Sequence, residues 1–124
     1  MMKMLFIMAA LICAPLASHA DMPRTLCDEA ADTSYEFIEN IFKTRPEIAY
    51  SPVRTDTDTQ LLRLSCLNGF NHGVKQDAAE MNMMFNQLRI RARKKNVSVE
   101  EARYLISDMS MALAYKAGYL AGVN

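Results

Sequence analysis

Apolar side chains in this chain recur mostly at intervals of three and four residues, which is the period of an α-helix. Between Thr25 and Lys43 they stand among acidic residues, at Leu26, Ala30, Phe37, Ile38, Ile41 and Phe42. This pattern predicts a first helix over residues 25–43. Lys43 and Arg45 suit the negative end of the helix dipole, and Pro46 ends the helix because its ring cannot continue it.

A second, longer repeat begins after Thr57 or Asp58, either of which is a suitable N-cap. Its apolar positions are 62, 66, 67, 70, 74, 78, 81, 85, 88 and 92. They predict one helix over residues 58–95, bent near Gly73. Asn96 is a residue at which such a helix stops readily.

Ser98 and Glu101 match the capping box that opens a third helix. The inner face of this helix is predicted to carry Ala102, Leu105, Ile106, Met109, Leu113, Ala117 and Leu120. Almost no segment alternates with the period of two that a strand requires, so we expect no sheet. The predicted fold class is therefore all-α, a small helical bundle of about three main helices.

Residues 44–58 hold two prolines and several hydroxyl side chains without a sustained apolar period, which predicts an irregular connection. Connections of this length often form binding surfaces. Tyr50 and Arg54 are its side chains best suited to contact a partner. The alternative is that Ile48, Tyr50 and Val53 cover the edge of the core.

Residues 1–20 have the composition of a secretory signal peptide. Lys3 precedes an apolar run from Met4 to Ala14, and Ser18-His19-Ala20 has small residues at its first and third positions. We expect cleavage after Ala20, release of a single helical domain over residues 21–124, and a location in the periplasm or outside the cell. The run is shorter than the roughly 20 residues that cross a bilayer, so no stable membrane anchor is expected.

The cysteines that remain after cleavage are Cys27 and Cys66, an even pair in an exported chain. Oxidising compartments favour cross-linked thiols, so one disulfide between them is predicted. Closing a loop of about 40 residues would stabilise the fold by roughly 4 kcal/mol. Two free, buried thiols are the alternative interpretation.

Charge is nearly balanced once the leader is removed, because loss of Lys3 leaves 13 basic side chains against 14 acidic ones. Nucleic acid is not the expected partner, since its binding draws on a basic excess. The basic cluster Arg89, Arg91, Arg93, Lys94 and Lys95 complements a helix dipole. It is alternatively an electropositive patch for an acidic protein partner.

The segment Gly69-Phe70-Asn71-His72-Gly73-Val74 has an echo in Gly118-Tyr119-Leu120-Ala121-Gly122-Val123. Each glycine within a helix costs about 1 kcal/mol relative to alanine, so close packing must offset it. Glycines four apart share one helix face, and two such faces can approach closely. Gly69, Gly73, Gly118 and Gly122 are therefore the predicted helix-packing residues. A second hypothesis is that these faces pair two copies into a homodimer or a self-assembling structural protein.

His72 has few partners for catalysis, and the mature chain lacks the recognised phosphate-loop, zinc-protease, nucleophile-elbow and C-x-x-C motifs. With one cysteine pair and one histidine, neither a metal cluster nor a Cys-His nucleophile is expected. We predict no enzyme, no metal and no cofactor. Ser65, Asn68, His72 and Gln76 form a polar stripe that faces either a partner or solvent.

Several stretches resemble, in order and rough spacing, the Spackle family of T-even bacteriophages. They are Leu26-Cys27-Asp28-Glu29, the stretch from Asn40 to Ile48, and Cys66-Leu67-Asn68-Gly69-Phe70-Asn71. The resemblance covers about residues 1–75 and does not extend to the rest of the chain. It implies an exported, singly disulfide-linked helical protein that inhibits a phage tail-spike lysozyme and takes part in superinfection exclusion.

A second likeness is confined to one helix. Cys66 to Val74 is similar to the C-x-G-[YF]-x-x-G-[VI] element of the Tai/Rap immunity proteins, with two residues instead of one between cysteine and glycine. That family protects bacteria from secreted peptidoglycan amidases.

Both likenesses imply a periplasmic protein that docks on a peptidoglycan-degrading enzyme, with a lysozyme preferred as target. The residues expected to bind this partner are Tyr50, Arg54, Asn68, Phe70, Asn71 and His72.

Overall fold

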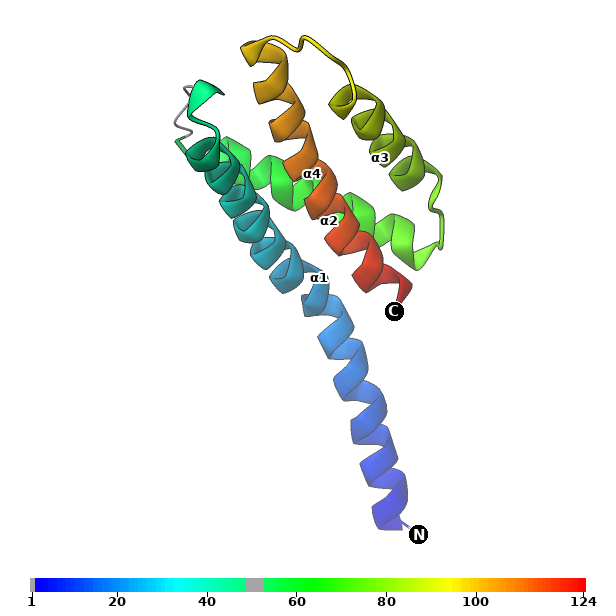
Figure 1. The fold of residues 1–124 in the computed structure, drawn as a ribbon. Coiled ribbons are helices and arrows are strands. Elements are labelled where there is room, and N and C mark those ends of the chain that lie inside the picture. Colours follow the sequence, from blue (N-terminus) through cyan, green and yellow to red (C-terminus); the bar gives the residue numbers. More distant parts are fainter. Residues whose placement is uncertain (1, 49–52) are drawn as a thin grey trace.

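The computed structural model describes residues 2–48 and 53–124, with side chains described from Pro23 onward within those ranges. The elements are α1 (Met2–Thr44), a short 3₁₀ helix η1 (Pro46–Ile48), α2 (Asp56–Val74), α3 (Ala79–Ala92) and α4 (Val99–Val123). No strand occurs in these ranges, so the predicted all-α fold is confirmed. In Figure 1, α4 lies between α1 and α3, and α2 crosses behind α4.

Helix α1 ends at Thr44, one residue beyond its predicted end, and begins at Met2 instead of near Thr25. The additional turns run through the predicted leader, whose Met, Leu and Ala residues have high helix propensity. In Figure 1 this N-terminal part extends beyond the other helices. Within the part of the chain that the structure describes, no helix is long and apolar enough to cross a membrane. Cleavage of the leader remains a prediction.

The prediction of one helix over residues 58–95 is wrong, because residues 75–78 separate α2 from α3. Gln76 adopts a positive φ of 55°, and the Asp77 backbone N–H donates to the His72 carbonyl at 2.9 Å. The Asp77 side chain accepts a hydrogen bond from the Ala79 N–H at 3.1 Å, just before α3, whose N-cap residue is Ala78. The bundle therefore has four main helices in the described ranges, not three.

The starts of α2 and α4 are set by side-chain caps. The N-cap of α2 is Thr55, not Thr57 or Asp58, and Asp58 is its partner in a reciprocal capping box. Ser98 caps α4 as predicted, because its hydroxyl accepts a hydrogen bond from the Glu101 N–H at 3.1 Å. Each cap satisfies a backbone donor that the first turn leaves unpaired.

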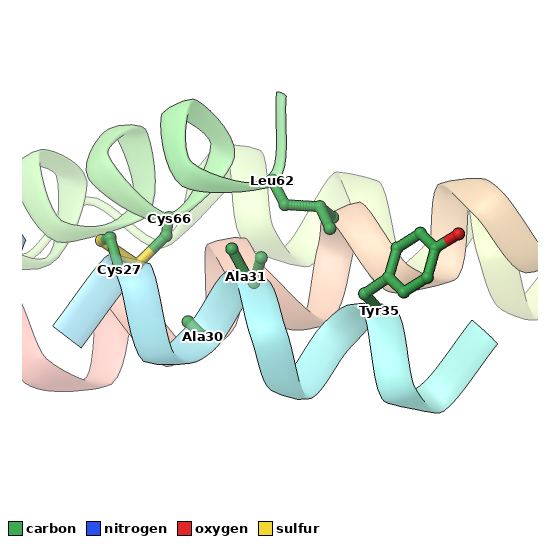
Figure 2. Close-up of a cluster of buried hydrophobic side chains, with 7 residues drawn as sticks. Cys27, Ala30, Ala31, Tyr35, Leu62 and Cys66 are labelled. Atoms are coloured by element: carbon green, nitrogen blue, oxygen red, sulfur yellow. A yellow bond between two sulfur atoms is a disulfide. The ribbon is translucent and has the colours of Figure 1, made fainter. Parts of the chain in front are cut away.

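The core joins α1 to α2 and α4 around a buried disulfide (Figure 2). Cys27 and Cys66 form the predicted bond, with Cα atoms 5.4 Å apart and both side chains inaccessible to solvent. Small side chains at Ala30 and Ala31 let α1 lie close to its neighbours, with Leu62 packed against them. A bond between positions 39 apart in the sequence stabilises the fold by about 4 kcal/mol.

The four glycines of the repeated segment all lie where α2 crosses α4. A Cβ atom on Gly69 would lie less than 3.0 Å from the Tyr115 carbonyl, and one on Gly118 less than 3.0 Å from the Cys66 carbonyl. A Cβ on Gly73 would lie 3.1 Å from the Gly122 Cα. The two backbones therefore touch with no room for a side chain, which supplies the packing that offsets the helical cost of glycine.

This crossing occupies both glycine faces within one chain. Neither face is left open to a second copy, so pairing of two copies would need a different surface.

Candidate functional site

Helices α1, α2 and α4 line an open groove of about 320 Å³. We call it the groove; its lining is mostly apolar and aromatic, and consists of Tyr35, Ile38, Phe42, Val53, Asp58, Leu61, Leu62, Glu100, Arg103, Tyr104, Ser107, Ser110 and Met111. Its size is at the lower end of the range for ligand sites in proteins, and a partner's side chains can enter it.

The rim of the groove exposes large apolar surface. Val53 is 80% exposed and Tyr104 is 61% exposed, whereas Tyr35 and Leu62 on the floor are buried. Side chains of this type gain most from being covered by another molecule, because burial removes their apolar area from water. The rim is therefore suited to a protein contact.

Two carboxylates and one guanidinium give the groove its polarity. Asp58 is held by the α2 cap, where its Oδ2 accepts hydrogen bonds from the Thr55 N–H at 3.1 Å and the Thr55 hydroxyl at 2.9 Å. Glu100 lies in the first turn of α4, where an acidic side chain complements the helix dipole. Both carboxylates therefore come from the first turns of helices that line the groove.

Arg103 holds one end of the groove together. Its Nη2 donates to the Ile48 carbonyl at 2.9 Å and so fixes η1 against α4. Because Ile48 is itself buried, this bond positions the segment that leaves α1.

Arg54, one of the predicted partner-binding residues, already has contacts within the chain. Its Nη2 lies 2.6 Å from Asp32 Oδ1, and its Nε donates to the Thr59 hydroxyl at 2.8 Å. The guanidinium also stands 5.3 Å from the centroid of the Tyr35 ring. Arg54 therefore ties the connection to α1 and α2 beside the groove. Tyr50, predicted with it, lies outside the described residues.

The remaining predicted partner-binding residues lie elsewhere on α2. Asn68 and Asn71 are exposed, and Phe70 is half-buried beside the glycine crossing. Leu62 lines the groove, beside which Arg54 lies, and His72 lies ten residues further along α2. At 1.5 Å per residue the two positions on α2 are about 15 Å apart. The structure thus does not bring Arg54 and His72 into one site.

His72 faces inward and connects three helices. Its Nδ1 contacts the Tyr115 hydroxyl of α4 and lies 3.3 Å from Glu80 Oε2 of α3. Ser65, also on the predicted polar stripe, donates to the Met111 carbonyl at 2.8 Å. The stripe is therefore divided, since these two members serve packing while Asn68 faces solvent.

Burial raises the pKa of the Tyr115 phenol above its usual value of 10.0, and the carboxylates of Glu80 and Asp77 and the nearby Tyr119 raise it further. The hydroxyl consequently stays protonated at neutral pH and is available to hydrogen-bond His72. Among the described residues, no group of three or more His, Cys, Asp or Glu side chains is arranged to hold a metal ion.

Sequence reasoning missed the groove, although a signal for it was present. Leu61, which lines the groove, stands off the line formed by Leu62 and Cys66 and is exposed. Tyr104 comes directly before Leu105, which the apolar period predicted to lie on the inner face of the same helix. Apolar residues beside a buried face indicate that an unpartnered surface adjoins the core.

Comparison with known proteins gave no match: no family model, no curated protein and no solved structure matches the chain.

Proposed function

We propose that this protein is a periplasmic inhibitor that binds and blocks a peptidoglycan-degrading enzyme of the lysozyme type, and that the groove is its docking surface. The groove is the observation that supports the proposal most strongly, because it combines a concave apolar floor with an exposed aromatic rim. The identity of the target rests on the Spackle resemblance, which includes Cys27 and Cys66. A leader and a disulfide are consistent with action outside the cytoplasm.

The lining indicates what kind of segment the target inserts. Tyr104 and Val53 offer apolar area, and the carboxylates of Asp58 and Glu100 stand at the edge of the same groove. A loop with an apolar side chain followed by a basic one complements both features. Aromatic anchors usually contribute most of the energy at such interfaces.

Inhibition needs no chemistry from the protein itself. A standard interface buries about 800 Å² on each partner, enough to cover the cleft of a small hydrolase. The disulfide and the glycine crossing fix α1, α2 and α4 relative to one another before binding. A preorganised surface loses less conformational entropy on association, which strengthens binding.

The test measures wall lysis in the presence of the protein purified from the periplasm. Lysozyme-type hydrolases and peptidoglycan amidases of the host and its phages are each titrated with it on purified cell walls. The proposal predicts saturable slowing of a lysozyme-type enzyme. Slowing of an amidase alone would favour the immunity role suggested by the Tai/Rap likeness, and no slowing of any hydrolase would refute both.

A matched pair of variants tests the surface. Tyr104→Ala removes an exposed aromatic from the rim, whereas Leu120→Ala removes an exposed apolar side chain about 24 Å further along α4. We expect Tyr104→Ala to weaken inhibition tenfold or more, as roughly 1.4 kcal/mol or more at an interface anchor implies. Leu120→Ala should inhibit like the unmodified protein; equal loss in both would exclude the groove as the surface.

A further inference from the structure

The charges of this chain are segregated although its net charge is close to zero. Five basic residues and no acidic residue lie between Glu80 and Glu100, and the five are Arg89, Arg91, Arg93, Lys94 and Lys95. The long connection from α3 to α4 and the end of α3 are therefore uniformly cationic.

Two of these cations, Arg91 on α3 and Lys94 in the connection after it, pair with carboxylates of α4. Arg91 Nη1 lies 2.7 Å from Asp108 Oδ2, and Lys94 Nζ lies 3.2 Å from Glu101 Oε2. Leu88 is the buried residue of α3 and faces the same neighbour. These contacts attach α3 and the following connection to α4. Arg89, Arg93 and Lys95 take no part in them.

The opposite side of α3 is exposed and chemically mixed. We call it the α3 outer face; it comprises Met83, Arg89 and Ile90 on the helix, the C-cap residue Arg93, and Lys95 in the connection that follows, all of them exposed. Met83 and Ile90 are seven residues apart, two helical turns, so they lie on one side. They are 57% and 62% exposed, and none of the three cations has an ion pair among the described residues.

Acidic residues gather on the far side of the molecule. Glu29 and Glu36 are exposed on α1 without an ion pair among the described residues, and α4 separates α1 from α3 in Figure 1. An anionic plane attracts the unpaired cations of the α3 outer face and repels these two carboxylates of α1.

We propose that the α3 outer face docks reversibly on an anionic phospholipid bilayer. The face is convex, because it is the outer side of a single helix and the residues just after it. A convex basic surface suits a flat anionic bilayer better than it suits a pocket in a protein. Its arginines and lysine pair with lipid phosphates, and Met83 and Ile90 contact the headgroup region beside them. This inference is independent of the enzyme that the groove binds.

The experiment measures binding to vesicles by co-sedimentation at low ionic strength. The protein purified from the periplasm is mixed with vesicles of equal parts phosphatidylglycerol and phosphatidylcholine, or of phosphatidylcholine alone. Its intact mass is checked first, because an uncleaved apolar leader would bind vesicles of either charge. We expect binding to the anionic vesicles, none to the neutral ones, and release as salt is raised.

A charge-matched pair of variants locates the surface. Arg89→Gln/Arg93→Gln leaves the Arg91 and Lys94 ion pairs intact, and Arg24→Gln/Lys43→Gln removes the same charge from exposed positions on α1. Each basic residue near an anionic surface contributes about fivefold in affinity, so the first variant should bind roughly 25-fold more weakly. The α1 variant should bind as well as the unmodified protein or better.

Three results would overturn the inference: no binding to anionic vesicles, equal binding to neutral ones, or equal weakening by both variants. Retention on immobilised polyglutamate without vesicle binding would also overturn it, since that pattern indicates an acidic protein partner. Circular dichroism of both variants establishes that α3 remains folded.

Discussion

Replacement of Gly69 by alanine should destabilise the protein, although alanine is the better helix former. The new Cβ would lie less than 3.0 Å from the backbone carbonyl of Tyr115, which cannot rotate away as a side chain would. Overpacking costs about 1–3 kcal/mol, and a backbone clash belongs at the upper end of that range. Alanine recovers about 1 kcal/mol of helix propensity, so the expected net loss is about 2 kcal/mol.

Urea unfolding followed by circular dichroism measures this loss. We expect a lower midpoint with an unchanged slope, and a melting temperature lowered by about 10 °C for a domain of this size. Asn71→Ala, on the exposed side of the same helix, is the matched control and should be neutral or slightly stabilising. A Gly69→Ala protein as stable as the unmodified one would show that α2 and α4 do not approach this closely.

Three further predictions concern stability. Reducing the bond between Cys27 and Cys66 should lower the free energy of unfolding by about 4 kcal/mol, measured in denaturant with and without reductant. A loss below about 1 kcal/mol would show that the bond does little to fix α1 against α2. Because the folded pKa of Tyr115 is raised, its contribution to stability is present below pH 10 and is lost as the pH rises further. Tyr115→Phe should flatten this decline between pH 9 and 11, and an unaltered slope would argue against burial. Arg54→Ala should cost about 1 kcal/mol, and a double-mutant cycle with Asp32→Ala should show coupling of that pair.

Local signals predicted the end of α1, the start of α4 and the cross-link. Pro46 stops α1 because of its own ring, Ser98 starts α4 through its own hydroxyl, and the two cysteines outside the predicted leader permit one intramolecular pairing. Each of these features depends on residues that are few or close in sequence. They are therefore readable without knowledge of the packing.

The break between α2 and α3 was missed because the apolar spacing continues across it. Val74, Ala78 and Met81 follow one another at four and three residues, as they would in an uninterrupted helix. Asp77 three residues before Glu80 was an available start signal, since an acidic side chain there accepts from the new helix. The prediction followed the apolar period, whereas the turn at residues 75–78, with Gln76 at positive φ, separates the two helices.

The groove depends on three elements distant in sequence. Tyr35, Leu62 and Tyr104 come from α1, α2 and α4, and no local pattern specifies that they surround one cavity. The binding residues expected from sequence were chosen instead by side-chain type. That criterion selected Arg54 and His72, which the structure gives partners within the chain.

Site-specific photocross-linking tests directly whether the rim of the groove touches the target enzyme. A benzophenone side chain is placed at position 104 in the groove or, as the control, at position 120 of α4. Illumination with the lysozyme-type hydrolase that the protein slows should give a one-to-one adduct from position 104 and none from position 120. An adduct from position 120 alone, or from neither position, would show that the rim of the groove does not contact the hydrolase.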